Sequence, residues 1–215
     1  MTKEIKLSLS VIAASFAAGV YFYPLMPEMV ASHWGIGGQA DDYMPKFWGL
    51  FLMPIMSLAI FGLFLLLPKI DPMKANYAKF RKYYDGFLLA FVVFMAYIYA
   101  LTLFWNKGAN IDMEKAIIPA MAVLFYIVGT VLEKAKQNWF IGIRTPWTLS
   151  SEKVWDKTNK LAAKLFKTFA IIVLFSILFG PEVFIGTILL LVVTSIYLTL
   201  YSYLEFRKEA RHIKD

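Results

Sequence analysis

The stretch from Asn138 to Trp155 holds the residues best suited to chemistry, and it reads N-W-F-I-G-I-R-T-P-W-T-L-S-S-E-K-V-W. Its Arg144 lies between two tryptophans, where an arginine could stack on a ring and still offer its guanidinium fork to a carboxylate or a phosphate. Gly142 and Pro146 predict that the chain bends around this arginine. The sequence contains no Walker-type, Gly-x-Ser-x-Gly or His-Glu-x-x-His pattern, so no catalytic residue is predicted.

A basic helix is expected directly after this loop. Ser150 or Ser151 is suited to cap its first turn, and Trp155, Asn159 and Ala162 share one face at helical spacing. The lysines of this segment are Lys153, Lys157, Lys160 and Lys164. Taken alone, the segment is typical of an amphipathic helix that lies on anionic lipid. That interpretation does not explain the bent loop before it.

A second cluster of polar residues lies in the glycine-rich segment 24–46. A bend at Gly35–Gly38 would let His33 meet Asp41 or Asp42. We therefore predict a site that binds a peptide or a small ligand, formed by His33, Trp34, Asp41, Asp42 and Lys46. The alternative is a loop that its aromatic residues merely anchor at the membrane interface.

Metal chemistry is not expected. The chain has no cysteine, so a thiolate site cannot form, and its two histidines, His33 and His212, stand far apart in the sequence. We predict neither a metal site nor a cofactor.

The composition places the chain among membrane proteins, because 60% of its 215 residues are hydrophobic. A water-soluble domain of this length needs more polar residues to cover its surface. The formal net charge of +7 would suggest a nucleic-acid partner for a soluble protein. Here the cations lie beside apolar segments, where they orient a protein in the bilayer. Lipid is the expected partner, and direct binding of nucleic acid is not expected.

Six apolar segments are long enough, or nearly so, to cross the bilayer as helices. They are Ile5–Tyr23, Phe47–Leu67, Phe87–Trp105, Ile117–Leu132, about Leu165–Phe179 and Val183–Tyr203. Backbone in lipid must satisfy its own hydrogen bonds, which helices do. Lys167, near the start of the fifth segment, can extend its ammonium group to the interface. The predicted fold is an all-α membrane protein with six transmembrane helices, forming a single domain over residues 1–215.

Lysine and arginine in the connections predict the orientation. Basic and non-basic connections alternate at each crossing. The basic ones are the amino terminus, the connections after the second and fourth spans, and the carboxyl terminus. We expect both termini in the cytoplasm of a multi-pass cell-membrane protein. Segment 24–46 would then face outward, and the loop and basic helix of 133–164 would face inward.

Residues typical of helix ends mark the connections. Asp71 and Pro72 suit the start of a short helix that runs through Tyr84. Asn110 is expected to open the fourth span, and Gly180–Pro181 predicts a tight turn between the last two spans.

Both unusual stretches resemble the SdpI family of bacterial and archaeal six-helix membrane proteins. The first is similar to the family's amino-terminal region in Pro27, His33, Gly38 and Asp41, with Trp34 after the histidine and Lys46 further on. The second resembles the family signature Asn-x-x-x-Gly-x-Arg-x-Pro-Trp-Thr. This signature is carried here by Asn138, Gly142, Arg144, Pro146, Trp147 and Thr148, and is followed by Trp155 and Asn159.

The resemblance implies immunity against a secreted peptide toxin, with capture of the toxin signalled to a cytoplasmic regulator. An extracellular peptide toxin and a cytoplasmic regulator are then the expected partners, and the protein is not expected to be an enzyme.

Two alternatives stay open. A small-solute or lipid transporter is suggested by prolines and by hydroxyls such as Ser176 and Thr194, although no ionisable side chain lies at mid-span. A membrane enzyme would use Asn138, Arg144 and Trp155 near lipid headgroups.

Overall fold

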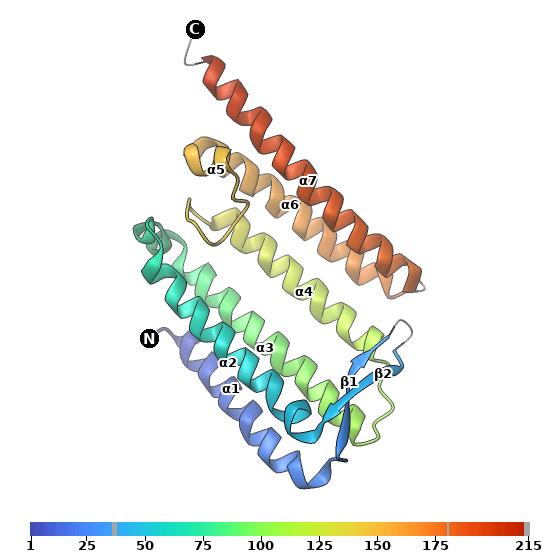
Figure 1. Ribbon diagram of the computed structural model, residues 1–215. Coiled ribbons are helices and arrows are strands. Elements are labelled where there is room, and N and C mark those ends of the chain that lie inside the picture. Colours follow the sequence, from blue (N-terminus) through green and yellow to red (C-terminus); the bar gives the residue numbers. More distant parts are fainter. Residues whose placement is uncertain (36–37, 180, 213–215) are drawn as a thin grey trace. The chain divides into compact units, whose positions relative to one another are not determined.

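The computed structural model describes residues 1–35, 38–179 and 181–212, and most of them are helical (Figure 1). The chain divides into two compact units, described separately below. Unit 1 comprises residues 1–65 and 88–121, and unit 2 comprises residues 66–87 and 122–215. The predicted bend at Gly35–Gly38 and the predicted turn at Gly180–Pro181 each include residues outside the described ones.

The helical prediction is confirmed for every apolar segment. The α-helices are α1 (Lys3–Phe22), α2 (Lys46–Ile70), α3 (Arg81–Asn106), α4 (Met113–Lys134), α5 (Pro146–Ser150), α6 (Glu152–Ser176) and α7 (Pro181–His212). Two short 3₁₀ helices, η1 (Tyr23–Leu25) and η2 (Lys74–Phe80), precede the first strand and α3.

Five segments of the described chain are helical, long enough and apolar enough to cross a membrane. They are Lys3–Leu25, Lys46–Ile70, Lys74–Asn106, Met113–Lys134 and Gly186–Arg211. Helix α6 is not among them. Its apolar part runs only from Leu165 to Ser176, about 18 Å at the rise of an α-helix, whereas the hydrocarbon core is about 30 Å thick. The sixth span therefore stays a prediction.

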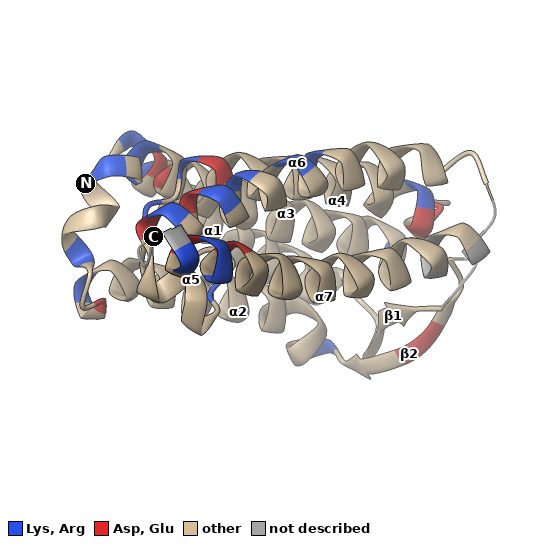
Figure 2. Cartoon of the chain, turned by 90° about the horizontal axis from the view of Figure 1, so that it is seen from above, with Lys and Arg blue, Asp and Glu red and all other residues tan. Residues whose placement is uncertain are grey.

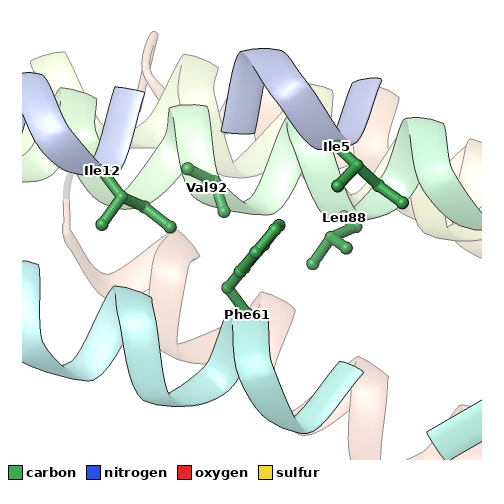
Figure 3. Close-up of a cluster of buried hydrophobic side chains, with 5 residues drawn as sticks. All are labelled: Ile5, Ile12, Phe61, Leu88 and Val92. Carbon is green, nitrogen blue, oxygen red and sulfur yellow. The ribbon is translucent and has the colours of Figure 1, made fainter. Parts of the chain in front are cut away.

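The core of unit 1 is a set of apolar side chains at helical spacing. Figure 3 shows Ile5 and Ile12 of α1 facing Phe61 of α2 and Leu88 and Val92 of α3. The seven-residue and four-residue separations bring each pair onto one face of its helix. A second buried cluster contains Met26, Val30, Leu50, Tyr99 and Leu103. Burial of these faces holds the helices of unit 1 together.

A β-hairpin stands in unit 1 where the sequence predicted a loop. Strand β1 (Met29–Trp34) pairs in antiparallel fashion with β2 (Ala40–Pro45), with irregular register near His33. The segment Met29–Trp34 has the β-branched and aromatic residues of a strand and ends at glycine, so the signal was present in the sequence. The hairpin is the exception to the all-α prediction.

The core of unit 2 is formed by α4, α6 and α7. Leu132 of α4, Ala162 and Ala163 of α6 and Leu198 of α7 form a buried cluster. Gly129 lets α4 approach α6 closely, because a Cβ atom there would lie 2.9 Å from the carbonyl oxygen of Ala163. Small residues at such contacts are typical of helix packing in membranes.

The basic helix predicted to lie on lipid is continuous with the predicted fifth span. Both form α6, which runs without a break from Glu152 to Ser176 and lies beside α7 (Figure 1). Ser151 caps it, because its Oγ accepts a hydrogen bond from Val154 N at 3.2 Å. Figure 2 shows that Lys and Arg are confined in α7 to its carboxyl-terminal end. That end meets the amino-terminal end of α6, where Glu205 bonds Lys157.

Two predicted helix starts are shifted. After Asp71 the chain forms the 3₁₀ helix η2 and then α3 from Arg81, instead of one short helix through Tyr84. Asp112, not Asn110, caps α4, because its Oδ1 accepts from Lys115 N at 3.1 Å. Asp112 takes this role because it directly precedes α4, and a capping side chain must reach the backbone amides of the first turn.

Candidate functional site

The predicted loop in unit 2 is organised by the side chain of Asn138, which is completely buried. Its Oδ1 accepts hydrogen bonds from Phe140 N at 2.9 Å and Ile141 N at 2.6 Å. Its Nδ2 donates to Lys136 O and to Ile141 O, each at 2.8 Å. The side chain of Asn138 thus supplies the hydrogen bonds that these backbone groups would otherwise need from other backbone groups. It holds residues 136–141 in one conformation.

A buried aspartate that the sequence analysis did not single out as a site residue completes this turn. Asp71 is 2% exposed, and its Oδ2 accepts from Trp139 N at 2.9 Å and from the Tyr77 hydroxyl at 3.2 Å. Its Oδ1 accepts from Met73 N at 2.6 Å. The Tyr77 hydroxyl also lies 3.3 Å from Oδ1 of Asn138. Asp71 therefore ties η2 to the loop that follows α4.

We expect Asp71→Asn to destabilise the protein by about 1–3 kcal/mol. The amide has one accepting oxygen, so its NH₂ group faces backbone N–H groups that the carboxylate now satisfies. Chemical unfolding of the purified protein in detergent measures the loss. Asp156→Asn is the matched control, because this half-exposed carboxylate forms only surface ion pairs, with Lys136 at 3.4 Å and with Lys160 at 4.0 Å. Each such contact is worth at most about 1 kcal/mol. Equal stability of the two variants would contradict a structural role for Asp71.

Gly142 lies where the loop meets α6. Its φ of +123° is in the region that favours glycine. A Cβ atom there would come within 2.8 Å of Oδ1 of Asn159 and 3.0 Å of the Trp155 ring. Both neighbours are fixed, since Asn159 Oδ1 accepts from Ile143 N at 2.8 Å and Trp155 Nε1 donates to Ala135 O at 3.0 Å. Gly142, Trp155 and Asn159 are thus brought together, as structural parts of the loop.

The short helix α5 is the next part of the loop. Thr145 and Thr148 form a reciprocal capping box at its start, and Pro146 occupies the first turn, where its missing N–H costs nothing. Thr145 Oγ1 also lies 3.0 Å from Ser202 Oγ of α7. The Trp147 ring packs on Tyr203 of α7 at 5.1 Å between centroids. These contacts fasten α5 to α7.

Arg144 is the motif residue that combines charge with exposure. Its Nη1 donates to the carbonyl oxygen of Trp139 at 2.7 Å, so the guanidinium is positioned by a hydrogen bond in place of the predicted stacking. Its other donors have no hydrogen-bond partner in the described part of the chain. Trp139 itself is 47% exposed. The loop therefore presents a cation and an aromatic ring to whatever lies beside it.

Charged residues join α6 to α7 next to this loop. Glu205 accepts from Lys157 at 2.5 Å and from Lys208 at 2.7 Å, and the hydrogen bond to Glu205 holds the pKa of Lys157 above its usual value. Ser151 donates to Glu209 at 2.6 Å. A small cavity of about 140 Å³ lies beside Trp155, lined by polar residues that include Gln137 and Asp156.

The candidate site in unit 1 is on the hairpin. His33 Nδ1 lies 2.6 Å from Asp41 Oδ1, which confirms the predicted meeting of these residues, and their side chains are 68% and 51% exposed. Lys46 pairs with Glu28 at 2.7 Å. Asp42 accepts from the backbone N–H of Tyr43 at 2.8 Å. The prediction that this group binds a ligand stays a prediction.

Two residues of α3 hold the hairpin in place, and the sequence analysis did not identify either. Asn106 accepts from Ala31 N at 2.8 Å and donates to Ala31 O at 3.1 Å, so its carboxamide pairs with β1 as a neighbouring strand would. The Trp105 ring packs edge to face on Trp34 at 5.6 Å. The only signal in the sequence was an asparagine after an apolar span.

Three of the five residues invoked for the alternative functions, Asn138, Trp155 and Ser176, are committed to structure. Asn138 and Trp155 are buried and hydrogen-bonded within the loop, so of the three residues suggested for a headgroup enzyme only Arg144 is exposed. The hydroxyl of Ser176 donates to Val173 O of its own helix at 2.7 Å. Among the described residues no group of three His, Asp or Glu side chains could hold a metal ion.

Comparison with known proteins finds relatives along almost the whole chain. Residues 134–202 match the model of the SdpI/YfhL protein family. Residues 11–58 match a domain of unknown function (DUF1648), so the hairpin lies in a separately described domain. The Immunity protein SdpI of Bacillus subtilis (strain 168) is 26% identical over 209 residues, which are 97% of this chain and 98% of that protein. No solved structure matches. The resemblance to the SdpI family is confirmed.

Proposed function

We propose, from the confirmed resemblance of this chain to the SdpI family, that it is an SdpI-type membrane immunity protein. It protects the cell that makes it from a secreted peptide toxin, by binding and not by catalysis. The observation that carries this proposal is the similarity to the Immunity protein SdpI over 97% of the chain, which includes both motif-bearing segments. The helices able to span a membrane fit a multi-pass membrane protein.

In this proposal the hairpin recognises the toxin at the outer face. The His33–Asp41 pair supports it, because both side chains are exposed while β1, which carries His33, is held by Asn106. An exposed histidine paired with a carboxylate offers a donor and an acceptor at one place on a surface. Trp34 packs on Trp105 and Lys46 pairs with Glu28, next to the hairpin. Asp42 adds a second exposed carboxylate.

The Arg144 loop acts on the opposite face, where it contacts a cytoplasmic regulator. Its support is the exposed guanidinium, which suits a carboxylate or phosphate of a partner. The orientation follows from the alternation of basic and non-basic connections, with both termini and the Arg144 loop inside. Six spans are part of this proposal, with α6 as the fifth.

Growth protection tests the function. Bacillus subtilis cells that lack their own SdpI and produce this chain should grow in the presence of the toxin against which SdpI protects. The double substitution His33→Gln and Asp41→Asn should lower protection at least about tenfold in toxin concentration, the effect of losing roughly 1.4 kcal/mol of binding. Ser32→Ala is the control, because it changes the same strand and leaves the His33–Asp41 pair intact.

Membrane levels of each variant, measured by immunoblot, separate lost function from lost protein. Full protection by the double variant would remove the recognition role from the His33–Asp41 pair. Failure of the unaltered chain to protect, with normal levels in the membrane, would overturn the immunity function itself.

A further inference from the structure

Unit 1 contains a concavity of about 590 Å³ that none of the predicted site residues lines. Its described lining comes from the hairpin turn (Gly38 and Gln39), the end of α3 (Trp105 and Asn106) and the connection 108–112 to α4. A volume of this size is typical of ligand sites, which span about 300–1,000 Å³. It opens beside the hairpin to which the proposed function assigns toxin recognition.

The lining offers hydrogen-bonding groups that the fold does not use. The side-chain amides of Gln39 and Asn110 have no hydrogen-bond partner among the described residues. The Asn106 amide, in contrast, is committed to Ala31 and Thr102. Each free carboxamide presents one acceptor and two donors. It can therefore accept from a backbone N–H and donate to a backbone C=O of an extended peptide. Asn106 shows the same chemistry in the chain itself, since its carboxamide pairs with both backbone groups of Ala31.

An aromatic wall stands beside these amides. Trp105 lines the concavity and packs edge to face on Trp34. The indole N–H of Trp34 is buried and has no hydrogen-bond partner among the described residues, and such an orphan donor is costly. An indole face gives an apolar side chain a large contact area at little cost in conformational entropy.

The charge of the lining also restricts the ligand. Asp112 is the one ionisable residue in it, since the described lining contains no lysine, arginine or histidine. Its carboxylate is bonded to Lys115, at 2.9 Å from the ammonium, and the hydrogen bond from Lys115 lowers its pKa. A lining with one paired carboxylate and two free amides suits a neutral main chain better than an anion.

We propose that this concavity binds an extended segment of the toxin peptide, whose main chain pairs with the amides of Gln39 and Asn110 and whose apolar side chain rests on Trp105. This inference rests on the proposed function, because the peptide is the one against which the chain protects. The His33–Asp41 pair then contacts the same peptide outside the concavity.

The test is binding of the toxin against which Bacillus subtilis SdpI protects, labelled with a fluorophore, to the full chain in lipid nanodiscs. Asn110→Trp fills the concavity from an exposed position and should raise Kd at least about tenfold, or roughly 1.4 kcal/mol. Asn110→Ala removes one amide and should raise Kd about fivefold, which corresponds to one hydrogen bond of about 1 kcal/mol. Lys107→Trp is the matched control, because Lys107 is exposed in the same connection and lies outside the lining. It should leave Kd unchanged.

The outcomes separate the site from the function. Equal binding by Asn110→Trp and the unaltered chain would overturn the site, and protection in cells would still stand. Protection without any binding in nanodiscs would overturn the site in the same way. Binding that depends on Asn110, in a chain that protects no cell, would support the site and overturn the proposed function. Binding of the fluorophore alone, equally weakened by Asn110→Trp, would assign the concavity to small apolar solutes and overturn the peptide proposal.

Discussion

Replacing Asn138 by alanine is expected to lower the free energy of unfolding by about 3–4 kcal/mol, near the upper end for a single substitution. The side chain makes four hydrogen bonds to backbone groups of residues 136–141 and one to Tyr77. Alanine leaves those donors and acceptors without partners in a buried place, and each costs its own desolvation. Chemical unfolding of the purified chain in detergent measures the change.

Asn110→Ala is the control for this measurement, because Asn110 is exposed and its side chain has no partner among the described residues. That variant should change stability by less than about 0.5 kcal/mol. If Asn138→Ala changed stability no more than the control, the loop would owe its conformation to other contacts. The same comparison checks that Asn110 variants used for binding are folded.

Gly142→Ala is expected to destabilise the protein by about 3 kcal/mol, with two causes that add. An L-residue at a positive φ costs roughly 1–2 kcal/mol. The new Cβ also lies 2.8 Å from Asn159 Oδ1 and 3.0 Å from the Trp155 ring, and such overpacking costs about 1–3 kcal/mol. The midpoint of chemical unfolding in detergent reports the sum, provided that the slope of the transition is unchanged.

A second glycine separates the two causes. Gly108 has a φ of +90°, and a Cβ atom there would meet nothing within 4 Å. Gly108→Ala therefore measures backbone strain alone, and it should cost about 1–2 kcal/mol. Equal losses at the two positions would mean that the loop yields to the added methyl group without cost, and that Gly142 is needed only for its backbone conformation.

The helices of this chain were predictable because an apolar run of sufficient length in lipid has only one way to satisfy its backbone. The meeting of His33 with Asp41 or Asp42 was predictable because the aspartates follow only eight and nine positions later, with glycines in between. The hairpin itself was missed. Its strands are six residues each, and among long apolar segments such a short strand signal was interpreted as a connection.

Asp71 could not be predicted as part of the loop, because its partner Trp139 lies 68 residues away. In the sequence Asp71 followed by proline indicates a helix start, and it does bond the backbone N–H of Met73. Its second oxygen bonds a loop that is distant in the sequence. A long-range contact of a single carboxylate leaves no periodic pattern in a sequence.

The motif of the loop was found because of its unusual composition, yet most of its residues fold the loop. Asn138, Gly142, Thr148, Trp155 and Asn159 are occupied with backbone groups or with one another. Arg144 remains as the exposed charge of the motif. Residue type drew attention to this loop, and the geometry distinguishes the residues that build the loop from Arg144, which is exposed.

The unbroken course of α6 joins the end of the Arg144 loop to the predicted fifth span in one continuous helix. The helix has 25 residues and is therefore about 37 Å long. Near its amino-terminal end, Trp155 donates a hydrogen bond to Ala135 O, and Asn159 accepts one from Ile143 N. If the apolar end of the helix lies in the bilayer as predicted, we expect a tilt of α6 to be transmitted to the Arg144 loop, because the helix is continuous between them.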